Sequence, residues 1–452
     1  MAPPTTPPAD ATARQRASLA TTLTLRRELG RWDLTAIGVN QVIGAAVFAQ
    51  PSLYAASVGA WSPWMVAAVG LVSLLIALSF AEVSSRFDAT GGPYLCTRAA
   101  FGRFAAFEVG WMMWFTRAAS WAAVINVLAT ALALYLPSLA AGWTRALLIT
   151  VIIAAITAIN ICGIRQSSWV LNFLTIGKLV PLAVFIIAGA FFIEWPRLEP
   201  GAAPPFAQLS ATGLLLIFAF GGYEVIPVPA GEARDPRSAV PFALIMTIVV
   251  VTIVMTLAQV VAVGTLPELA GSKTPLADAS LRFMGAGGAA LMTFGAVIST
   301  SGNNMGQALS GSRNLFALAE QGDLPRFFGY VHPRFRTPII AILITSSVSL
   351  IMAVSGRYAE LALVSAVSRL LVYVATCAST LRLRTSRAVA PPTFVVPWGP
   401  VIPVTAIAIA VAMLAGARRE QLAAGATALA VGAVLYLIAI TNIRQQGAED
   451  AR

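Results

Sequence analysis

The sequence predicts an all-α integral membrane protein with twelve transmembrane helices, organised as two five-helix units followed by two further helices. Three observations lead to this prediction. The 452 residues are 58% hydrophobic and only 11% charged, which is too little polar material to cover a soluble protein of this length. Many apolar stretches approach the ~20 residues that cross about 30 Å of hydrocarbon. Two of these stretches are interrupted by glycine and proline at matching places.

The spans are expected to be helices, because a stretch such as 244–263 is apolar on all sides whereas a membrane strand alternates polar and apolar residues. An even number of spans places both termini on one side of the membrane. In chain order, the twelve predicted spans are 34–58, 62–83, 104–136, 145–162, 168–192, 211–229, 241–264, 287–317, 338–354, 361–381, 401–414 and 423–441.

Composition divides the chain into five segments. Residues 1–30 predict a disordered cytoplasmic tail, because they begin with a Pro-, Ala- and Thr-rich run and the first apolar stretch is too late and too long for a cleavable signal. Two five-helix repeats are expected at 31–192 and 205–384. Two accessory transmembrane helices are expected at 398–441, and a second cytoplasmic tail is expected at 442–452.

Charge predicts the orientation of these spans. Of the 30 Lys and Arg residues, 20 lie in segments on the same side as the N-terminus and seven in the opposite loops. This positive-inside pattern indicates a multi-pass protein of the cell inner membrane with both termini in the cytoplasm. The same pattern accounts for the net charge of +11 through topology, so nucleic acid is not an expected partner.

Residues that could carry enzymatic or metal chemistry are scarce. Cys96, Cys162 and Cys377 are isolated and lack metal-ligand spacing, and the single histidine, His332, has no neighbouring acid or base partner. A membrane enzyme acting on lipid would need polar groups near one interface, whereas the polar concentration lies at mid-depth. We therefore expect no enzyme activity, no metal and no cofactor.

Two spans break the rules of a continuous helix. Span one contains Gly44 with Pro51 shortly after, and span six contains Gly221 and Gly222 followed by Pro227. Gly221 lies 177 positions after Gly44, about the distance expected if spans one to five and six to ten are two copies of one unit. Paired interruptions of this kind point to a substrate site at the middle of the membrane. The alternative is that these residues only allow close packing or kinks.

Unwound helices offer free backbone groups to a substrate. The start of a half-helix carries partial positive charge that suits a carboxylate, while freed carbonyl groups suit an ammonium. An α-amino acid needs both, so the pattern fits an amino acid better than a sugar or a lipid.

At these places the sequence also resembles a known family. The strings SFAEVSSRFDATGGPYLCTRAAFG after span two, FAFGGYEVIPVPAGEARDPRSAVP at span six and SGSRNLFALAEQGDLPRFF after span eight are similar to signature stretches of amino acid–polyamine–organocation permeases. The similarity runs from about Leu25 to Arg384. It implies the inverted-repeat leucine-transporter fold with two further helices, and secondary active transport of amino acids by alternating access.

The resemblance also implies which residues bind the substrate. The backbone of the first interruption, expected to meet the substrate carboxylate, comprises Ile43, Gly44, Ala45 and Ala46. The second interruption, expected to contact the ammonium and the side chain, comprises Gly221, Gly222 and Tyr223, with Phe218 at an aromatic gate. Family members commonly carry a second glycine where this chain has Ala46, and the added methyl group is expected to narrow the pocket.

Four charged residues lie deep within predicted spans. Lys178 is about ten residues into span five, too deep to reach water, and a lysine there costs about 2.5–3.5 kcal/mol on insertion scales. In the family, a lysine at this position replaces a sodium ion between spans one, five and eight, which implies sodium-independent transport with Lys178 in proton coupling. The alternative is a purely structural cation.

Glu224 matches by position the carboxylate that couples protons in arginine–agmatine exchange, and its alternative role is to pair with a buried cation. Arg117 in span three either pairs with Glu224 or faces the substrate. Arg369 in span ten is interpreted as structural. A pocket containing Arg117 should repel lysine, arginine and polyamines, so neutral amino acids are favoured, with acidic ones also compatible.

The expected function is therefore sodium-independent, proton-coupled transport of neutral amino acids. The alternatives are obligatory amino acid exchange, or a non-transporting channel or nutrient sensor on the same fold. The expected partners are an amino acid, protons and the lipid bilayer, and the expected assembly is a monomer or homodimer.

Overall fold

The computed structural model describes residues 29–449 except 90, 134–135, 163–167 and 388; the side chains of 168–174 and 442–449 are also not described. Most of the predicted tail 1–30, and the end of the second tail, therefore lie outside the described residues. The described part is helical, and its β pairing consists of an isolated bridge between Leu29 and Ala233. This confirms the all-α prediction for the described part.

Helices of membrane-spanning character follow one another along the chain. Within the described residues, eight are long and apolar enough to cross a membrane, and four shorter ones are also apolar. Every predicted span overlaps one of these twelve segments. The chain therefore has the helices of a multi-pass membrane protein. The number of crossings and the inverted repeat stay predictions.

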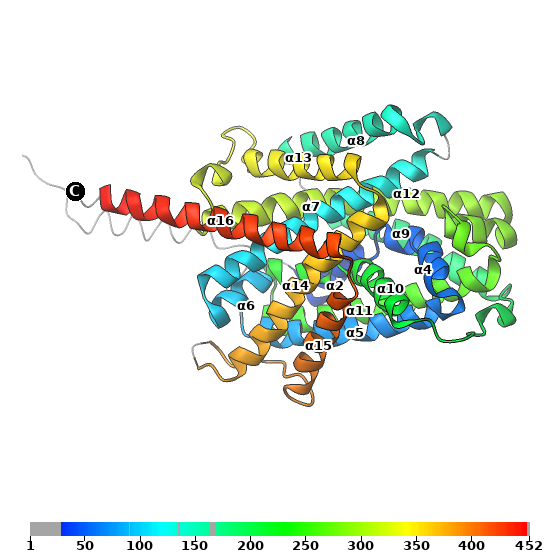
Figure 1. Ribbon diagram of the computed structural model, residues 1–452, viewed down its shortest axis with the longest axis horizontal. Coiled ribbons are helices and arrows are strands. Elements are labelled where there is room, and N and C mark those ends of the chain that lie inside the picture. Colours follow the sequence, from blue (N-terminus) through cyan, green and yellow to red (C-terminus); the bar gives the residue numbers. More distant parts are fainter. Residues whose placement is uncertain (1–28, 90, 134–135, 163–167, 388, 450–452) are drawn as a thin grey trace, which may run out of the picture.

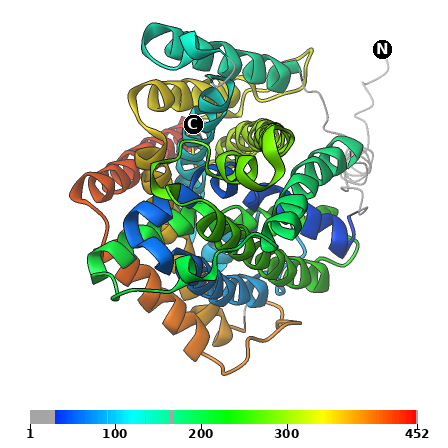
Figure 2. The same ribbon diagram turned by 90° about the vertical axis from the view of Figure 1, so that its right-hand side faces the viewer.

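The helices are α2 (Arg31–Val42), α3 (Ala46–Ala49), α4 (Pro51–Val58), α5 (Ser62–Ser84), α6 (Gly92–Phe101), α7 (Arg103–Ala133), α8 (Gly142–Cys162), α9 (Ser168–Ala190), α10 (Phe206–Phe220), α11 (Pro236–Thr265), α12 (Pro275–Glu320), α13 (Ile339–Ser355), α14 (Tyr358–Arg384), α15 (Val401–Ala415) and α16 (Arg419–Glu449). Most run roughly along the long axis of the molecule (Figure 1). Seen end-on, α8 and α13 lie at one edge of the bundle and α15 at the opposite edge (Figure 2).

Two elements differ from the predicted spans. The short helix α6 was not predicted, because ten residues are too few to show a membrane-spanning pattern. It has Pro93 in its first turn and ends at Phe101, before Gly102, whose φ of 87° suits glycine. Span eight was predicted from residue 287, but α12 begins at Pro275. A bend at Gly285, with a φ of 65°, separates its first turns from the long part of the helix.

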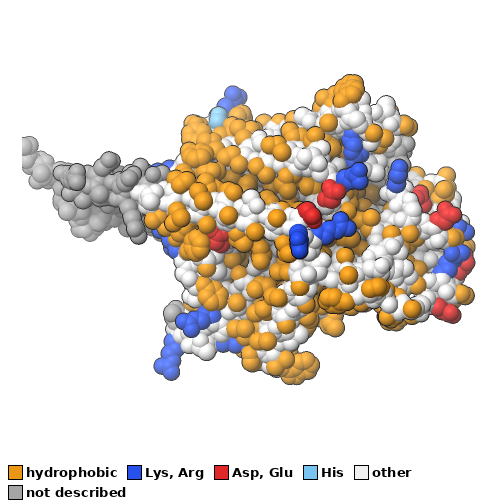
Figure 3. Space-filling view, viewed as in Figure 1, with side chains coloured by type: hydrophobic (Ala, Val, Ile, Leu, Met, Phe, Trp, Pro, Cys, Tyr) orange, Lys and Arg blue, Asp and Glu red, His pale blue; other side chains and the backbone are white. Residues whose placement is uncertain are grey.

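The surface agrees with a lipid environment. Large apolar side chains on several helices are more than half exposed, among them Trp64, Leu147, Ile187 and Ile253. Hydrophobic side chains are spread over most of the visible face, whereas charged side chains occur there in a few groups (Figure 3). Exposed apolar area of this extent is not tolerated in water, so it indicates contact with lipid.

At the end of the bundle where α6 lies, here named the α6 end, buried charges tie several elements together. Asp323, which follows α12 and is fully buried, accepts hydrogen bonds from Arg103 Nε at 2.5 Å and from Tyr94 at 2.6 Å. Burial and the bond to Asp323 raise the pKa of Tyr94 well above its usual range, so its hydroxyl remains a donor. Glu82 of α5 pairs with Arg384 of α14 in the same region.

The chain ahead of α2 is also fixed at the α6 end by its backbone. Leu29 donates to the carbonyl of Glu232 at 3.0 Å, and Arg234 donates to the carbonyl of Leu29 at 3.0 Å. This pairing joins the start of α2 to the segment that leads into α11. The α6 end is thus held by both ion pairs and backbone bonds.

Breaking the Asp323 cluster should expose Cys96, a buried thiol on α6. In a background with the exposed Cys162 replaced by serine, Asp323→Asn is expected to raise the rate of Cys96 modification by a thiol reagent at least about tenfold, because two charge-assisted bonds of ~1.5–3 kcal/mol each are weakened. Gln321→Ala is the matched control, since it removes one exposed bond from Arg98. Equal rates in the wild-type and Asp323→Asn proteins would contradict this role of Asp323.

Candidate functional site

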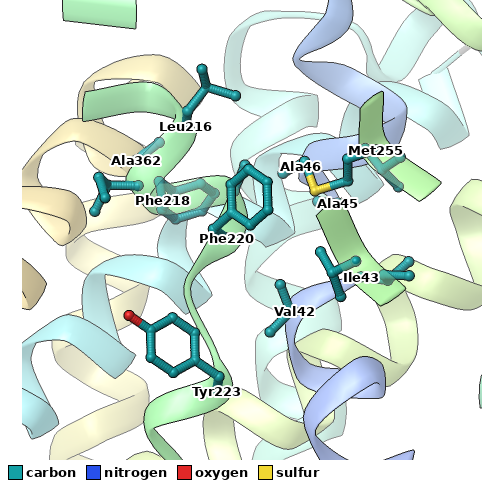
Figure 4. Close-up of a cluster of buried hydrophobic side chains, with 14 of the residues drawn as sticks. Val42, Ile43, Ala45, Ala46, Leu216, Phe218, Phe220, Tyr223, Met255 and Ala362 are labelled. Carbon is teal, nitrogen blue, oxygen red and sulfur yellow. The ribbon is translucent and has the colours of Figure 1, made fainter. Parts of the chain in front are cut away.

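Two interrupted helices lie against each other in the middle of the bundle. Helix α2 ends at Val42 and helical structure resumes at Ala46, while α10 ends at Phe220 and Gly221 is extended. Gly222 has a φ of 136°, and a Cβ atom there would lie 2.8 Å from the backbone carbon of Gln41, so this position requires glycine. Figure 4 shows the extended segment between Phe220 and Tyr223 beside Val42 and Ile43. Both interruptions occur where the sequence predicts them.

A narrow cavity of about 20 Å³ lies between the two interruptions. Of the predicted substrate-binding residues, those that line it are Gly44, Ala45, Ala46, Phe218 and Gly221. Further lining residues that the argument below uses are Gln41, Ser120, Asn303, Gln307 and Arg369. This space is here named the central cavity.

The other predicted contacts lie behind its walls. Ile43 is fully buried and its carbonyl is already bound. The amide of Gly222 donates to Glu224 at 2.8 Å, and the ring of Tyr223 is buried against Tyr373. The substrate contacts of Ile43, Gly222 and Tyr223 stay predictions.

Lys178 of α9 reaches the interruption of α2. Its ammonium donates to the carbonyl of Asn40 at 3.0 Å and to that of Ile43 at 2.8 Å. Ser299 of α12 donates to the carbonyls of Gly44 at 3.1 Å and Ile43 at 3.3 Å. A single buried cation thus satisfies carbonyls that the end of the helix would leave free, between the three helices that the sequence analysis named.

Glu224 is the centre of a second buried cluster. Its Oε1 lies 2.5 Å from Arg117 Nη2 and 3.3 Å from Arg369 Nε. Its Oε2 accepts hydrogen bonds from Tyr373 at 3.0 Å and from the amide of Gly222. The second interruption is therefore fixed by a carboxylate between two arginines, and Arg117 pairs with Glu224, one of the two arrangements left open by the sequence.

A chain of side-chain amides connects this cluster to the first interruption. Arg117 Nη1 donates to Gln307 at 3.2 Å, Gln307 donates to Asn303 at 3.3 Å, and Asn303 donates to the carbonyl of Gln41 at 3.0 Å. Arg117 itself packs beside Thr116 and Glu224, where the remaining space is too narrow for a water molecule. Arg117 is thus linked to the central cavity through Gln307, and its direct contact with substrate stays a prediction.

Two larger cavities lie toward the end opposite α6. Their volumes are about 350 and 410 Å³, and both are lined by Asn126, Thr130 and Tyr358. The ring of Tyr358 packs edge-on against that of Phe218, with 6.0 Å between their centroids. This aromatic pair therefore separates the central cavity from the larger cavities.

Sequence reasoning missed the neutral polar residues of the site. Asn303 and Gln307 occur in the string STSGNNMGQ in the middle of α12, and this concentration of polar residues within an apolar span could have indicated them. Ser120 of α7 had no comparable signal. Among the described residues, no group of three or more His, Cys, Asp and Glu side chains lies together in a way that could hold a metal.

Comparison with known proteins gives consistent matches over most of the chain. The family model described as amino acid permease matches residues 29–441. An uncharacterized transporter of Mycobacterium tuberculosis is 31% identical over 421 residues, with 91% of each chain covered. The branched-chain amino acid permease of Bacillus subtilis is 26% identical, covering 92% of this chain and 93% of its own. The serine/threonine exchanger of the same bacterium is 28% identical, covering 85% and 89%.

Proposed function

The chain belongs to the amino acid permease family, whose members are multi-pass membrane transporters rather than enzymes, and from this premise we propose that it carries amino acids across the inner membrane by alternating access. The observation that carries the proposal is the central cavity between two interrupted helices. Backbone groups of Gly44, Ala45 and Ala46 would meet the substrate carboxylate. The segment from Phe218 to Tyr223 would meet its other groups.

The proposed transport is independent of sodium and coupled to protons. Lys178 supports the first part, because its ammonium occupies the carbonyl groups that a cation would otherwise bind. Lys178 and Glu224 are the ionisable residues proposed to carry the coupling. Obligatory exchange is a second candidate, favoured by the similarity to a protein named as a serine/threonine exchanger. A non-transporting sensor would bind the same ligands without moving them.

The proposed orientation of the protein in the membrane follows from the distribution of its Lys and Arg residues. The α6 end, which carries Arg98, Arg103 and Arg384, would face the cytoplasm together with both termini. The two larger cavities would then open away from the cytoplasm. In this orientation the ion pairs of Asp323 and Glu82 would close the cytoplasmic side of the protein.

Neutral amino acids are the proposed substrates. Buried Arg117, Lys178 and Arg369 exceed the single buried carboxylate of Glu224 at the centre, so lysine, arginine and polyamines would meet like charge. Two relatives bear names that refer to neutral amino acids, namely branched-chain amino acids and serine or threonine. Protons and lipid are the further proposed partners, and a monomer or homodimer is the proposed assembly.

Uptake of labelled amino acids into proteoliposomes tests the function. We expect saturable uptake of neutral amino acids that is unchanged when potassium replaces sodium and increases with an inwardly directed proton gradient. Uptake that requires internal amino acid would identify exchange instead. If arginine or putrescine competes better than alanine, leucine or glutamate, the specificity proposal is wrong; ligand binding without uptake would indicate a sensor.

The Phe218 and Tyr358 pair should affect substrate affinity. Phe218→Ala is expected to raise the KM for a neutral amino acid severalfold to tenfold, because the ring that closes the central cavity and its partner contact, worth about 0.5–1.5 kcal/mol, are lost. Tyr358→Phe keeps the ring and is the matched control, with a KM near wild type. Tyr358→Ala combined with Phe218→Ala should add little to either alone, and full additivity would show that the pair does not act as one unit.

A further inference from the structure

Arg369 has more hydrogen-bond donors than the protein uses. A guanidinium carries five N–H donors, and this one is 1% exposed. Its Nη1 donates to the carbonyl of Phe218 at 3.2 Å and its Nη2 to Ser120 at 3.3 Å. Its Nε is within ion-pair distance of Glu224 but has no hydrogen-bond partner among the described residues. Unused donors on a buried charge are costly, which indicates that another acceptor completes the site.

The guanidinium is placed in the wall of the central cavity by a glycine. A Cβ atom on Gly221 would lie 1.0 Å from Arg369 Nη1, so the arginine occupies the space that a side chain would fill. Its Cζ atom also lies 5.9 Å from the centre of the Phe218 ring, a cation–π arrangement that holds the charge in place. Gly44, Ala45 and Ala46 line the same cavity. A molecule in this cavity is therefore in reach of a fixed cation on one side.

The charge around the cavity is unbalanced. Among the described buried side chains at the centre, Lys178, Arg117 and Arg369 are cationic and Glu224 is the carboxylate between the arginines. Arg117 lies 2.5 Å from Glu224, closer than Arg369, which lies 3.3 Å away. The other carboxylate oxygen accepts bonds from Tyr373 and an amide. Arg369 is thus the less completely paired of the two arginines.

We propose that Arg369 is a specificity-determining residue that selects amino acids whose side chain carries an oxygen acceptor over aliphatic amino acids of the same size. The acceptor is a hydroxyl, a carboxamide or a carboxylate close to the backbone, because the cavity is small and Ala46 is one of its lining residues. The Phe218 carbonyl already accepts a hydrogen bond from Arg369, and the positively charged guanidinium would repel a substrate ammonium at this place. The side chain of the substrate, rather than its ammonium, therefore faces Arg369. The inference rests on the proposed function and narrows its substrate class.

Matched pairs of amino acids of nearly equal shape test the inference in proteoliposomes. Threonine is compared with valine, asparagine with leucine, and aspartate with asparagine. We expect the KM of threonine and asparagine to be at least about tenfold lower than that of their aliphatic partners, as for a hydrogen bond to a charged group. Aspartate should have a KM no higher than that of asparagine, because it also supplies negative charge.

Substitutions of Arg369 distinguish a role in substrate selection from a purely structural role. Arg369→Gln should raise the KM of threonine, asparagine and aspartate about tenfold while the KM of valine and leucine changes less than about twofold. Arg369→Lys keeps the charge and should retain the preference for aspartate over leucine. Arg384→Gln, on the same helix but at the α6 end, is the matched control, since it should leave the KM ratios unchanged whatever its effect on rate.

The outcomes are distinguishable. Wild-type protein that transports valine and leucine as well as threonine and asparagine overturns the inference, even if the Arg369 variants fail to fold, and leaves amino acid transport standing. A uniform change of all five KM values in Arg369→Gln also overturns it, because that result assigns Arg369 a structural role. Failure to take up any amino acid overturns the proposed function itself.

Discussion

Lys178→Ala is expected to abolish uptake of neutral amino acids, with the initial rate in proteoliposomes lowered at least about a hundredfold. The variant removes the ammonium that donates to the carbonyls of Asn40 and Ile43, within an interior that offers little water to replace it. Each hydrogen bond to a charged group contributes about 1.5–3 kcal/mol, so the loss of two corresponds to about 3 kcal/mol or more. The interruption of α2, which forms one wall of the central cavity, should then lose its fixed shape.

Ser299→Ala is the matched control for Lys178. The Ser299 hydroxyl donates to the carbonyls of Ile43 and Gly44 but carries no charge, so its loss should lower the rate only a fewfold. Transport should be measured across a pH series in both variants. If Lys178→Ala keeps substantial uptake with the full pH dependence of the wild type, Lys178 has no part in proton coupling.

Glu224→Gln should produce the largest loss of stability among single substitutions at the site. The glutamine leaves Arg117 and Arg369 buried without a counter-charge, and removing one partner of a buried ion pair costs about 3–5 kcal/mol. The thermal midpoint of the detergent-solubilised protein is expected to fall by about 5–10 °C, since each kcal/mol shifts the midpoint of a large domain by about 2 °C. Uptake should fall with it, because the same carboxylate binds the amide of Gly222.

Tyr373→Phe is the matched control for the carboxylate. It removes one hydrogen bond of 3.0 Å to Glu224 and leaves both ion pairs intact, so a loss of about 1 kcal/mol is expected. If Glu224→Gln and Tyr373→Phe have equal midpoints, the two arginines do not depend on Glu224 for their stability in the interior.

Local signals made the interruptions predictable from sequence. A glycine pair followed by prolines reports directly on the backbone at its own position, and the helices end beside Gly44 and Gly221 as expected. The depth of the charged residues within their spans was equally predictable, because Lys178 and Glu224 lie far from the ends of apolar runs. The overall orientation and the inverted repeat remain predictions.

The contact partner of each buried side chain, and the side of its helix on which it lies, were less predictable. Both depend on how the helices are rotated against each other. The depth of Arg369 in span ten does not indicate which side of the helix it faces, and the sequence analysis interprets it as structural. In the structure Arg369 approaches Glu224 and also lines the central cavity. The choice between Glu224 and substrate for Arg117 also required tertiary contacts. Asn303 and Gln307 were missed because a neutral amide interrupts a hydrophobic run much less than a charge does.

The backbone pairing of Leu29 with Glu232 and Arg234 has a mechanical consequence. It connects the chain entering the first interrupted helix to the chain leaving the second one, so the two cannot slide past each other at this end without first losing two hydrogen bonds. During a change of access they are expected to travel as one body. The surrounding helices would then move around these two interrupted helices. The distance between the two, and hence their contacts with a bound molecule, would stay nearly constant.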